Sequence, residues 1–142
     1  MLTELSMRSK AYWGYDQVFI DACADELRID AADLTDPDQV WRVAQSGERI
    51  AGVNVLTPVD DEIVELEALF VDPADIRSGV GRLLVDDAIA VARAKSFARL
   101  LIQGDPNAEG FYVAVGARRA GERESGSIPG RFLPLFEIDL TR

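Results

Sequence analysis

The stretch from Glu65 to Leu84 constrains the fold most, because it joins a strand, a turn and a helix start without interruption. It reads E-L-E-A-L-F-V-D-P-A-D-I-R-S-G-V-G-R-L-L. The apolar run predicts a strand, Asp72-Pro73 predicts a turn, and the glycines after Arg77 precede a long amphipathic pattern. The first amides of such a helix lack intrahelical partners and lie at the positive end of its dipole. They can therefore bind a phosphate group, and a diphosphate-bearing cofactor is the first hypothesis.

Spacing excludes two common phosphate-binding loops. A P-loop requires G-x-x-x-x-G-K-[ST], but Gly81 is followed by Arg82 and Leu83. A dinucleotide-binding fingerprint requires G-x-G-x-x-G, and Leu84 stands where its third glycine belongs. A glycine-rich turn of another class must therefore explain the pattern.

The segments on either side predict a mixed sheet. Three strand-like runs joined by short turns favour an antiparallel meander, and these runs are Val40–Ala44, Ile50–Leu56 and Ile63–Val71. A helix over Gly79–Lys95 followed by a strand over Arg99–Gln103 implies a parallel pairing with a right-handed connection. The other expected elements are a first helix over Ser9–Leu27 in which Gly14 allows a bend, a short helix near Ala108–Val115 and a last strand near Leu133–Leu140. The sequence thus predicts one mixed α/β (α+β) domain over residues 1–142.

Composition limits the classes of partner. The chain has 142 residues, 25 acidic and 15 basic side chains, and a formal net charge of −10. This charge disfavours nucleic acid, which needs a basic surface, and is compatible with a cationic substrate such as an amine. No apolar run approaches the roughly 20 residues that span a bilayer, and the first residues lack the apolar segment of a secretory signal. We therefore expect a cytoplasmic protein with no membrane partner.

Two absences narrow the chemistry. The chain has no histidine, which removes the usual general base, the Ser-His triad and most metal sites. It has one cysteine, Cys23, which lies in a helical pattern and is expected to be buried and structural. We expect no metal cofactor, and any catalysis must use carboxylates, hydroxyls, tyrosines and backbone amides.

Two segments together resemble one family of enzymes. V-D-P-A-D-I-R-S-G-V-G-R-L-L is similar to the acetyl-CoA-binding motif of the GNAT N-acetyltransferase superfamily, a strand ending in V-x-P followed by [QR]-x-x-G-x-[GA] and a helix. D-P-N-A-E-G-F-Y-V-A-V-G-A is similar to its N-x-x-A-x-x-F-Y-x-x-x-G-F segment. The chain departs from the first motif at Ile76, where Gln or Arg is usual, and from the second at Ala117, where Phe is usual.

The resemblance implies a fold and a co-substrate. The fold would be a single-domain, mostly antiparallel mixed sheet, splayed at the cofactor site and flanked by helices. Acetyl-CoA would pair its pantetheine arm with the central strand, through the backbone of Phe70 and Val71, and rest its diphosphate on the turn. The implied cofactor-binding residues are Leu69, Phe70, Val71, Arg77, Ser78, Gly79, Val80, Gly81, Arg82 and Asn107. Arg77 or Arg82 would substitute for the motif residue missing at Ile76.

Transfer of the acetyl group to a primary amine by direct attack needs an acid and a base. Tyr112 matches the family's acid for the leaving thiolate, and a free phenol has a pKa near that of a thiol. Glu65 and Glu67 are the candidate bases, because their spacing places both on the strand face that Leu69 and Val71 share. Glu65 is preferred as base and Glu67 as substrate contact. The alternative is that both glutamates form an ordinary solvated strand face.

Three residues are implied on the acceptor side. In this family the first helix, here with Trp13 and Tyr15, usually covers the acceptor, and Arg131 lies in a second candidate loop over Ile128–Arg131. The acceptor would be a small-molecule or peptide amine whose identity stays open. Members of the family often form homodimers, so a homodimer is one assembly that the resemblance implies. A catalytically inactive CoA-binding sensor or interaction module of the same fold is the competing interpretation.

Overall fold

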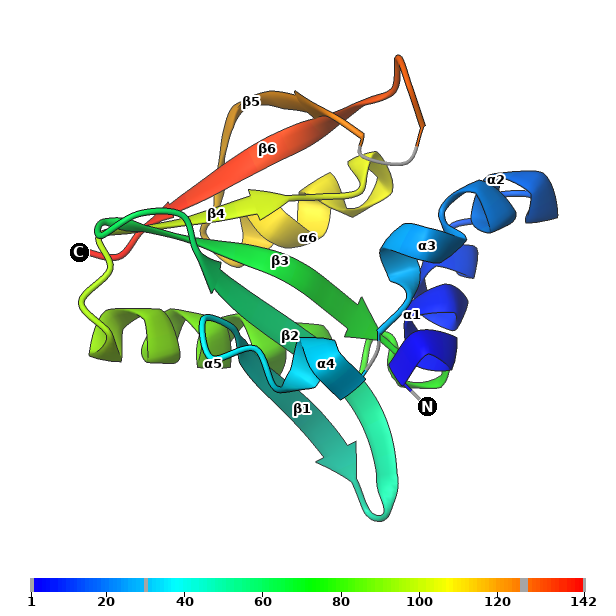
Figure 1. Ribbon diagram of the computed structural model, residues 1–142, viewed down its shortest axis with the longest axis horizontal. Coiled ribbons are helices and arrows are strands. Elements are labelled where there is room, and N and C mark those ends of the chain that lie inside the picture. The colour runs from blue at the N-terminus through cyan, green and yellow to red at the C-terminus, as the bar shows by residue number, and fades with distance from the viewer. Residues whose placement is uncertain (1, 30, 126–127, 142) are drawn as a thin grey trace.

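A six-stranded sheet organises the protein, seen in a computed structural model that describes residues 2–29, 31–125 and 128–141. The strands are β1 (Val40–Ser46), β2 (Arg49–Pro58), β3 (Ile63–Val71), β4 (Arg99–Gln103), β5 (Arg118–Glu124) and β6 (Phe132–Asp139). The α-helices are α1 (Leu2–Ala11), α2 (Gln17–Ala22), α3 (Ala24–Leu27), α4 (Ala31–Leu34), α5 (Val80–Ala94) and α6 (Glu109–Ala114), with 3₁₀ turns η1 (Pro73–Asp75) and η2 (Pro106–Ala108). Figure 1 shows β1–β3 and β4–β6 as two halves that meet at β3 and β4.

The sheet has the order β1-β2-β3-β4-β6-β5, and among its described strand pairs only β3–β4 is parallel. The predicted meander of β1, β2 and β3 is confirmed, as is the parallel pairing across α5. That parallel pairing joins Ile63–Leu66 to Arg99–Ile102 and goes no further. Beyond Leu66 the two strands diverge, so the expected splay in a mixed, mostly antiparallel sheet is confirmed. The rest of β3 has an open edge.

A β-bulge in β3 changes which residues share a face. Val55 of β2 pairs with Ala68 and Leu56 pairs with Leu66, so Glu67 has no partner in the ladder. Such an extra residue shifts the alternation of side chains by one. Leu69 therefore packs against the same core as Leu66, while Glu65 lies on the opposite face. The prediction that Glu65 shares a face with Leu69 and Val71 was wrong. It assumed that side chains alternate regularly along the strand, and the extra residue at the bulge interrupts that alternation.

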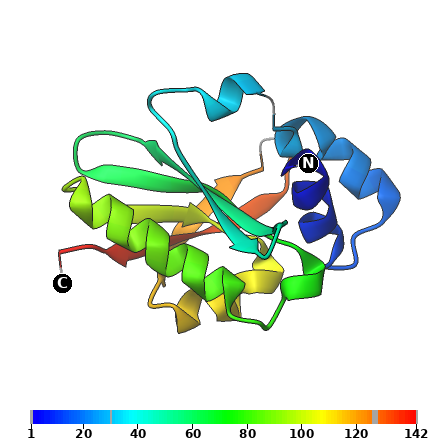
Figure 2. The same ribbon diagram turned by 90° about the horizontal axis from the view of Figure 1, so that it is seen from below.

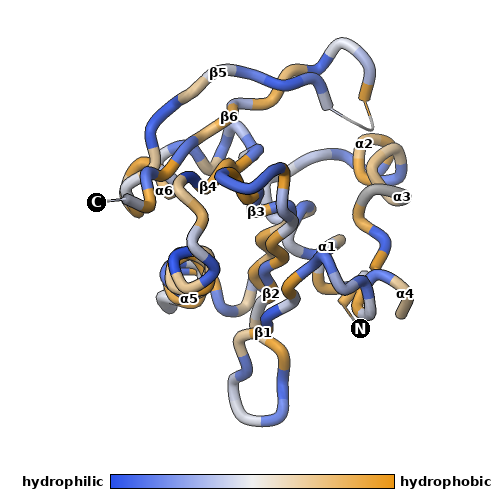
Figure 3. The backbone as a smooth tube through the Cα atoms, turned by 60° about the vertical axis from the view of Figure 1, so that its left-hand side comes forward, coloured by the Kyte–Doolittle hydropathy of each residue, from blue (hydrophilic) through white to orange (hydrophobic). Residues whose placement is uncertain are grey.

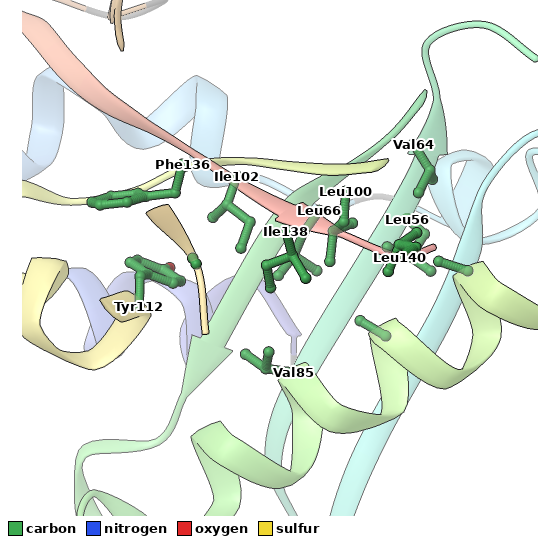
Figure 4. Packing of buried hydrophobic residues seen from close by; sticks show 13 residues of the cluster. Leu56, Val64, Leu66, Val85, Leu100, Ile102, Tyr112, Phe136, Ile138 and Leu140 are labelled. Atoms are coloured by element: carbon green, nitrogen blue, oxygen red, sulfur yellow. The ribbon is translucent and has the colours of Figure 1, made fainter. Parts of the chain in front are cut away.

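The main core lies between the sheet and helix α5. Leu84, Val85, Ala88 and Ala92 of α5 are buried, and Figure 4 shows Val85 facing the residues of β2, β3, β4 and β6. The cluster as a whole comprises Leu56, Val64, Leu66, Val85, Ala88, Ala92, Leu100, Ile102, Tyr112, Ala117, Phe136, Ile138 and Leu140. Helix α6 lies on the same face of the sheet as α5 (Figure 2). The core thus fixes the start of α5 and the position of Tyr112 relative to the splay.

The first predicted helix is divided into three. Helix α1 ends at Ala11, Gly14 has φ +83°, and the side chain of Asp16 caps α2 by accepting from the amide of Phe19 at 2.8 Å. The apolar spacing correctly indicated helix, but a glycine at positive φ followed by an N-cap residue ends one helix and begins the next. The loop between them brings aromatic side chains to the mouth of the splay.

Strand β5 was not predicted, and its composition explains why. It reads R-R-A-G-E-R-E, with most residues exposed, and Figure 3 draws it largely in the blue of hydrophilic residues. An edge strand without an apolar alternation gives no sequence signal of strand. Among the described residues, no helix is long and apolar enough to cross a membrane.

Candidate functional site

A cavity of about 890 Å³ occupies the splay between β3 and β4. It is lined from one side by the open part of β3 and the start of α5, and from another by the loops around α1–α3. Tyr112 of α6, the segment from Ile102 to Asp105 and Arg131 form much of the remaining wall. Predicted site residues from three distant parts of the sequence therefore line one cavity.

The open edge of β3 presents backbone groups to this cavity. The amide of Val71 points away from β2 and donates to Ser9 Oγ of α1 at 3.3 Å. By contrast, the next amide, that of Asp72, donates to Ala51 of β2 at 2.8 Å. A Cβ built on Gly52 would lie 2.9 Å from the carbonyl oxygen of Phe70, so that carbonyl also faces β2. Because backbone groups alternate along a strand, the backbone of Leu69 and Val71 faces away from β2, with Ser9 as the present acceptor of the Val71 amide. The expectation that the backbone of Phe70 faces the cofactor was wrong, since it faces β2, and Phe70 lines the cavity with its side chain.

Two ion pairs fix the turn after β3. Asp72 caps η1 through the amide of Ala74 and binds Arg8 of α1 at 2.9 Å, while Asp75 binds Arg49 of β2 at 2.8 Å. The hydrogen bond from Ala74, assisted by Arg8, lowers the pKa of Asp72, and the hydrogen bond from Arg49 lowers the pKa of Asp75. Both carboxyls are therefore ionised at neutral pH and hold the turn in one conformation.

The start of α5 leaves its first amides open. Arg77 and Gly79 have φ of +68° and +88°, which turns the chain sharply into the helix. No described residue accepts from the backbone amides of Gly79, Val80, Gly81 or Arg82. A Cβ on Gly81 would lie 3.1 Å from the ring of Phe111, so the glycine also allows α6 to approach. These free amides at a helix N-terminus suit a phosphate group.

The predicted cofactor residues divide by position. Leu69, Phe70, Val71, Arg77, Gly79, Gly81 and Arg82 line the cavity, whereas Ser78, Val80 and Asn107 do not. Ser78 instead bonds its hydroxyl to the carbonyl of Asp75 and stabilises the turn. Ile76 also lines the cavity, so the departure from the motif places an apolar side chain there.

Tyr112 lies at the inner wall of the cavity. Its side chain is only 7% exposed, between Phe111 and Phe136, and Figure 4 shows it beside Phe136 and Ile102. A Cβ on Gly104 would come within 2.7 Å of its ring, so the glycine is needed for this position. Burial, and to a lesser extent the charge of Asp105, raises the pKa of Tyr112 well above that of a free phenol. The phenol therefore stays protonated, and the near match of free phenol and thiol acidities does not hold here.

The two glutamates have different surroundings. Glu65 accepts from Arg123 of β5 at 2.6 Å, and Arg123 also donates to Gln103 at 3.3 Å. Glu67, at the bulge, is exposed and accepts through Oε2 from Gln39 at 3.1 Å and from the hydroxyl of Thr57. Both line the cavity. Glu65 is thus paired with a cation, whereas the described partners of Glu67 are neutral.

A polar group of five residues, the Asp105 cluster, joins the loops at the cavity mouth. Asp105 accepts from Lys10 at 2.8 Å, from the hydroxyl of Tyr15 at 2.9 Å and from the side chain of Asn107 at 2.9 Å. Arg131 completes the cluster by donating to the Tyr15 hydroxyl at 2.8 Å. Burial would raise the pKa of Asp105, but the hydrogen bonds from Lys10 and the Asn107 amide outweigh it, so this pKa is lowered.

The predicted acceptor residues are brought close together, although they do not all reach the cavity. Trp13 and Arg131 line it, while Tyr15 lies behind Arg131 and stacks on Phe19 with ring centroids 4.1 Å apart. Asn107, predicted to contact the cofactor, instead bonds Tyr15 and Asp105. Sequence reasoning missed Ser9, Lys10 and Arg123 as site residues, and no local pattern marks them. Asp105 also caps the following turn, by accepting from the backbone amide of Asn107 at 2.9 Å.

Comparisons with known proteins agree with this geometry. Residues 5–117 match the profile of the Acetyltransferase (GNAT) family. The chain is 25% identical over 115 residues to human N-acetyltransferase 8; the match covers 75% of this chain but only 51% of that protein, so the chain spans about half its length.

Solved structures share the fold. The PaiA N-acetyltransferase from Thermoplasma acidophilum, in complex with coenzyme A, superposes with a TM-score of 0.77 at 16% identity over 97% of this chain and 90% of that chain. An aminoglycoside 6′-N-acetyltransferase complexed with coenzyme A gives a TM-score of 0.73 at 14% identity over 98% and 88% of the two chains. At these identities the likeness establishes the arrangement of elements.

Proposed function

Since the chain belongs to the GNAT acetyltransferase family, we propose that it transfers an acetyl group from acetyl-CoA to a primary amine. The observation that carries the proposal is the open edge of β3, which leads directly to the free amides of α5 in one cavity with Tyr112. An extended amide-containing arm ending in a diphosphate fits this order of features. The residues present therefore fit acetyl-CoA as co-substrate.

Backbone contacts would hold the co-substrate. The amide of Val71 and the backbone of Leu69 would pair with the pantetheine arm, and the amides of Gly79–Arg82 would bind the diphosphate. Arg77 and Arg82 line the same wall and add positive charge, which compensates for the apolar Ile76. Phe70 would contribute apolar surface to the acyl end of the cavity.

Tyr112 is proposed as the acid. As the amine nitrogen forms its bond to the acetyl carbonyl carbon, the carbon–sulfur bond breaks and the departing sulfur needs a proton. Tyr112 carries a proton at neutral pH, as any phenol does, and its raised pKa keeps it protonated to higher pH. Its hydroxyl donates a hydrogen bond to the departing thiolate, and the sulfur takes that proton as solvent returns one to the phenol oxygen, so that no buried phenolate accumulates.

Glu67 is proposed as the base, in place of Glu65. An ammonium must lose a proton before it can attack, and a carboxylate with no cationic partner attracts it best. Glu67 has only the neutral donors Thr57 and Gln39 among the described residues, whereas Arg123 compensates the charge of Glu65. Glu67 would take the proton through a bridging water and pass it to solvent. Glu65, through Arg123 and Gln103, would instead join β3 to the strands across the splay.

The proposal is tested by measuring acetyl-CoA binding and thiol release separately. Calorimetry with the purified chain should show acetyl-CoA binding, and a panel of amines should give thiol release that depends on both substrates. Glu67→Gln should lower kcat/KM by about 10²-fold or more at neutral pH, while Glu65→Gln should act mainly on stability. Binding without thiol release across a broad panel would instead support a CoA-sensing or interaction module.

Two secondary proposals concern the oligomeric state of the protein and its cellular compartment. We propose a chain that works in the cytoplasm on a small-molecule or peptide amine, without nucleic acid or membrane, and that pairs as a homodimer. Light scattering of the purified chain tests the dimer directly, since a mass equal to one chain at micromolar concentration would exclude it.

A further inference from the structure

The Asp105 cluster contains one more positive than negative charge in a largely buried position. The exposed fractions of the Lys10, Asp105 and Arg131 side chains are 15%, 11% and 19%. A charge removed from water is costly unless an opposite charge compensates it. Asp105 can compensate one of the two cations fully, and its 2.8 Å contact assigns it to Lys10.

Arg131 is the cation farther from the Asp105 carboxylate, and no other described carboxylate forms an ion pair with it. Its Nη2 lies 3.9 Å from Asp105, because Tyr15, Lys10 and Asn107 already occupy the oxygens of that carboxylate. Nη2 donates to the Tyr15 hydroxyl instead, and no described residue accepts from Nε or Nη1. Within the part of the chain that the structure describes, the guanidinium therefore has unused donors, and one carboxylate at 3.9 Å compensates its charge only weakly.

The same contacts hold Arg131 in place. Its guanidinium carbon lies 4.7 Å from the centroid of the Phe19 ring and 5.3 Å from that of Tyr15. Stacking on aromatic rings together with one hydrogen bond restricts the side chain without neutralising it. A guanidinium held in this way is suited to bidentate recognition of a carboxylate. Arg131 lines the cavity, so a ligand there can reach it.

Glu67 carries the charge opposite to that of Arg131. It also lines the cavity, and its described partners are neutral. One cavity therefore offers a carboxylate to an ammonium and a guanidinium to a carboxylate. We propose that the acceptor is an amine of the amino-acid class, whose carboxylate binds Arg131 while its amino group lies toward Glu67. This inference rests on the proposed acetyltransferase function and specifies its substrate.

The test compares the proteinogenic L-amino acids with their carboxamides, which keep the amine and lose the carboxylate. For the best acceptor, the wild-type protein should have a kcat/KM about 10- to 100-fold higher for the acid than for the amide, as expected of a charge-assisted hydrogen bond. Arg131→Gln should abolish this preference through KM, and Arg131→Lys should retain part of it. Arg119→Gln, an exposed arginine of β5 paired with Glu109 and Glu122, is the matched control and should change nothing.

Three results would overturn the inference. They are equal use of acid and amide by the wild-type protein, a preference that survives in Arg131→Gln, and an Arg131→Gln effect confined to the Kd of acetyl-CoA, which would assign the arginine to a cofactor phosphate. The wild-type comparison needs no variant, so misfolding of Arg131→Gln does not affect it. If no acceptor is turned over, the proposed function fails, and calorimetry of acids and amides with the CoA-saturated chain still decides this inference: tighter binding of the acid supports it, and equal binding refutes it.

Discussion

The two walls of the cavity are built in different ways. The wall formed by β3 and the start of α5 comes from one continuous segment, Leu69–Arg82, and presents mainly backbone groups. The Asp105 cluster is gathered from residues as far apart as Lys10 and Arg131, and it works through side chains. Backbone recognition depends on conformation and tolerates changes of side chain, whereas the cluster depends on the identity of each residue. The first wall therefore suits a common co-substrate, and the second suits a particular acceptor.

The largest effect is expected where the two walls meet, at Tyr112. Tyr112→Phe removes the proposed acid and keeps the packing of the ring, so kcat should fall by about 10²- to 10⁴-fold. The Kd of acetyl-CoA by calorimetry should stay within about twofold, because no backbone contact changes. An unaltered kcat would show that solvent protonates the thiolate and that Tyr112 serves only the core.

Tyr112 also gives a pH prediction. Its raised pKa means that the protonated acid persists above pH 10, where a free phenol would ionise. The kcat of the wild-type protein should therefore not decline through pH 9–10 from loss of this acid. A descending limb centred near 10 that disappears in Tyr112→Phe would contradict the burial argument.

The next effect tests whether the first wall really depends on backbone. Gly81→Ala adds a Cβ 3.1 Å from the Phe111 ring, at the amides proposed for the diphosphate. The Kd of acetyl-CoA should rise by about 10- to 100-fold, because contacts between amides and a charged group are lost, while kcat at saturation changes little. Gly110→Ala in α6 is the matched control, since a Cβ there meets nothing within 4 Å. Equal Kd values for both variants would refute backbone recognition at this turn.

The same contrast explains what could be predicted from sequence. The strand, turn and helix of the first wall are consecutive, so periodicity and glycine spacing located them within one or two residues. The faces of Glu65 and Glu67 could not be inferred, because the bulge at Glu67 is set by pairing with Val55 and Leu56 of another strand. Likewise Lys10 is an ordinary lysine near a helix end until the fold brings it to Asp105. Interactions between distant side chains leave no local signal.

A moderate effect on stability should come from the second wall. The lowered pKa of Asp105 means that its charge stabilises the fold above the unfolded pKa of about 3.9, and that this contribution is lost as the pH falls through the folded value. Asp105→Asn should therefore lower the free energy of unfolding by about 1 kcal/mol at pH 7, since solvent screens the cluster on its cavity side. The loss should become progressively smaller below pH 4. Urea unfolding at both pH values measures this. Asp87→Asn is the control, because Arg42, the partner of Asp87, is exposed. This substitution should lower the free energy of unfolding by less than about 1 kcal/mol. A larger loss than for Asp105→Asn would contradict the prediction.

The smallest effect concerns Ser9, which belongs to neither wall but connects them. Ser9 Oγ accepts the Val71 amide that the pantetheine arm would use, and its neighbours Arg8 and Lys10 bind Asp72 on one side of the splay and Asp105 on the other. Binding of acetyl-CoA would therefore release one of three tethers of α1 beside the acceptor wall. Ser9→Ala removes a hydrogen bond that is already long at 3.3 Å, so the Kd of acetyl-CoA should fall by no more than about threefold. A rise in Kd would mean that Ser9 itself holds the co-substrate, and the two walls would then share a residue.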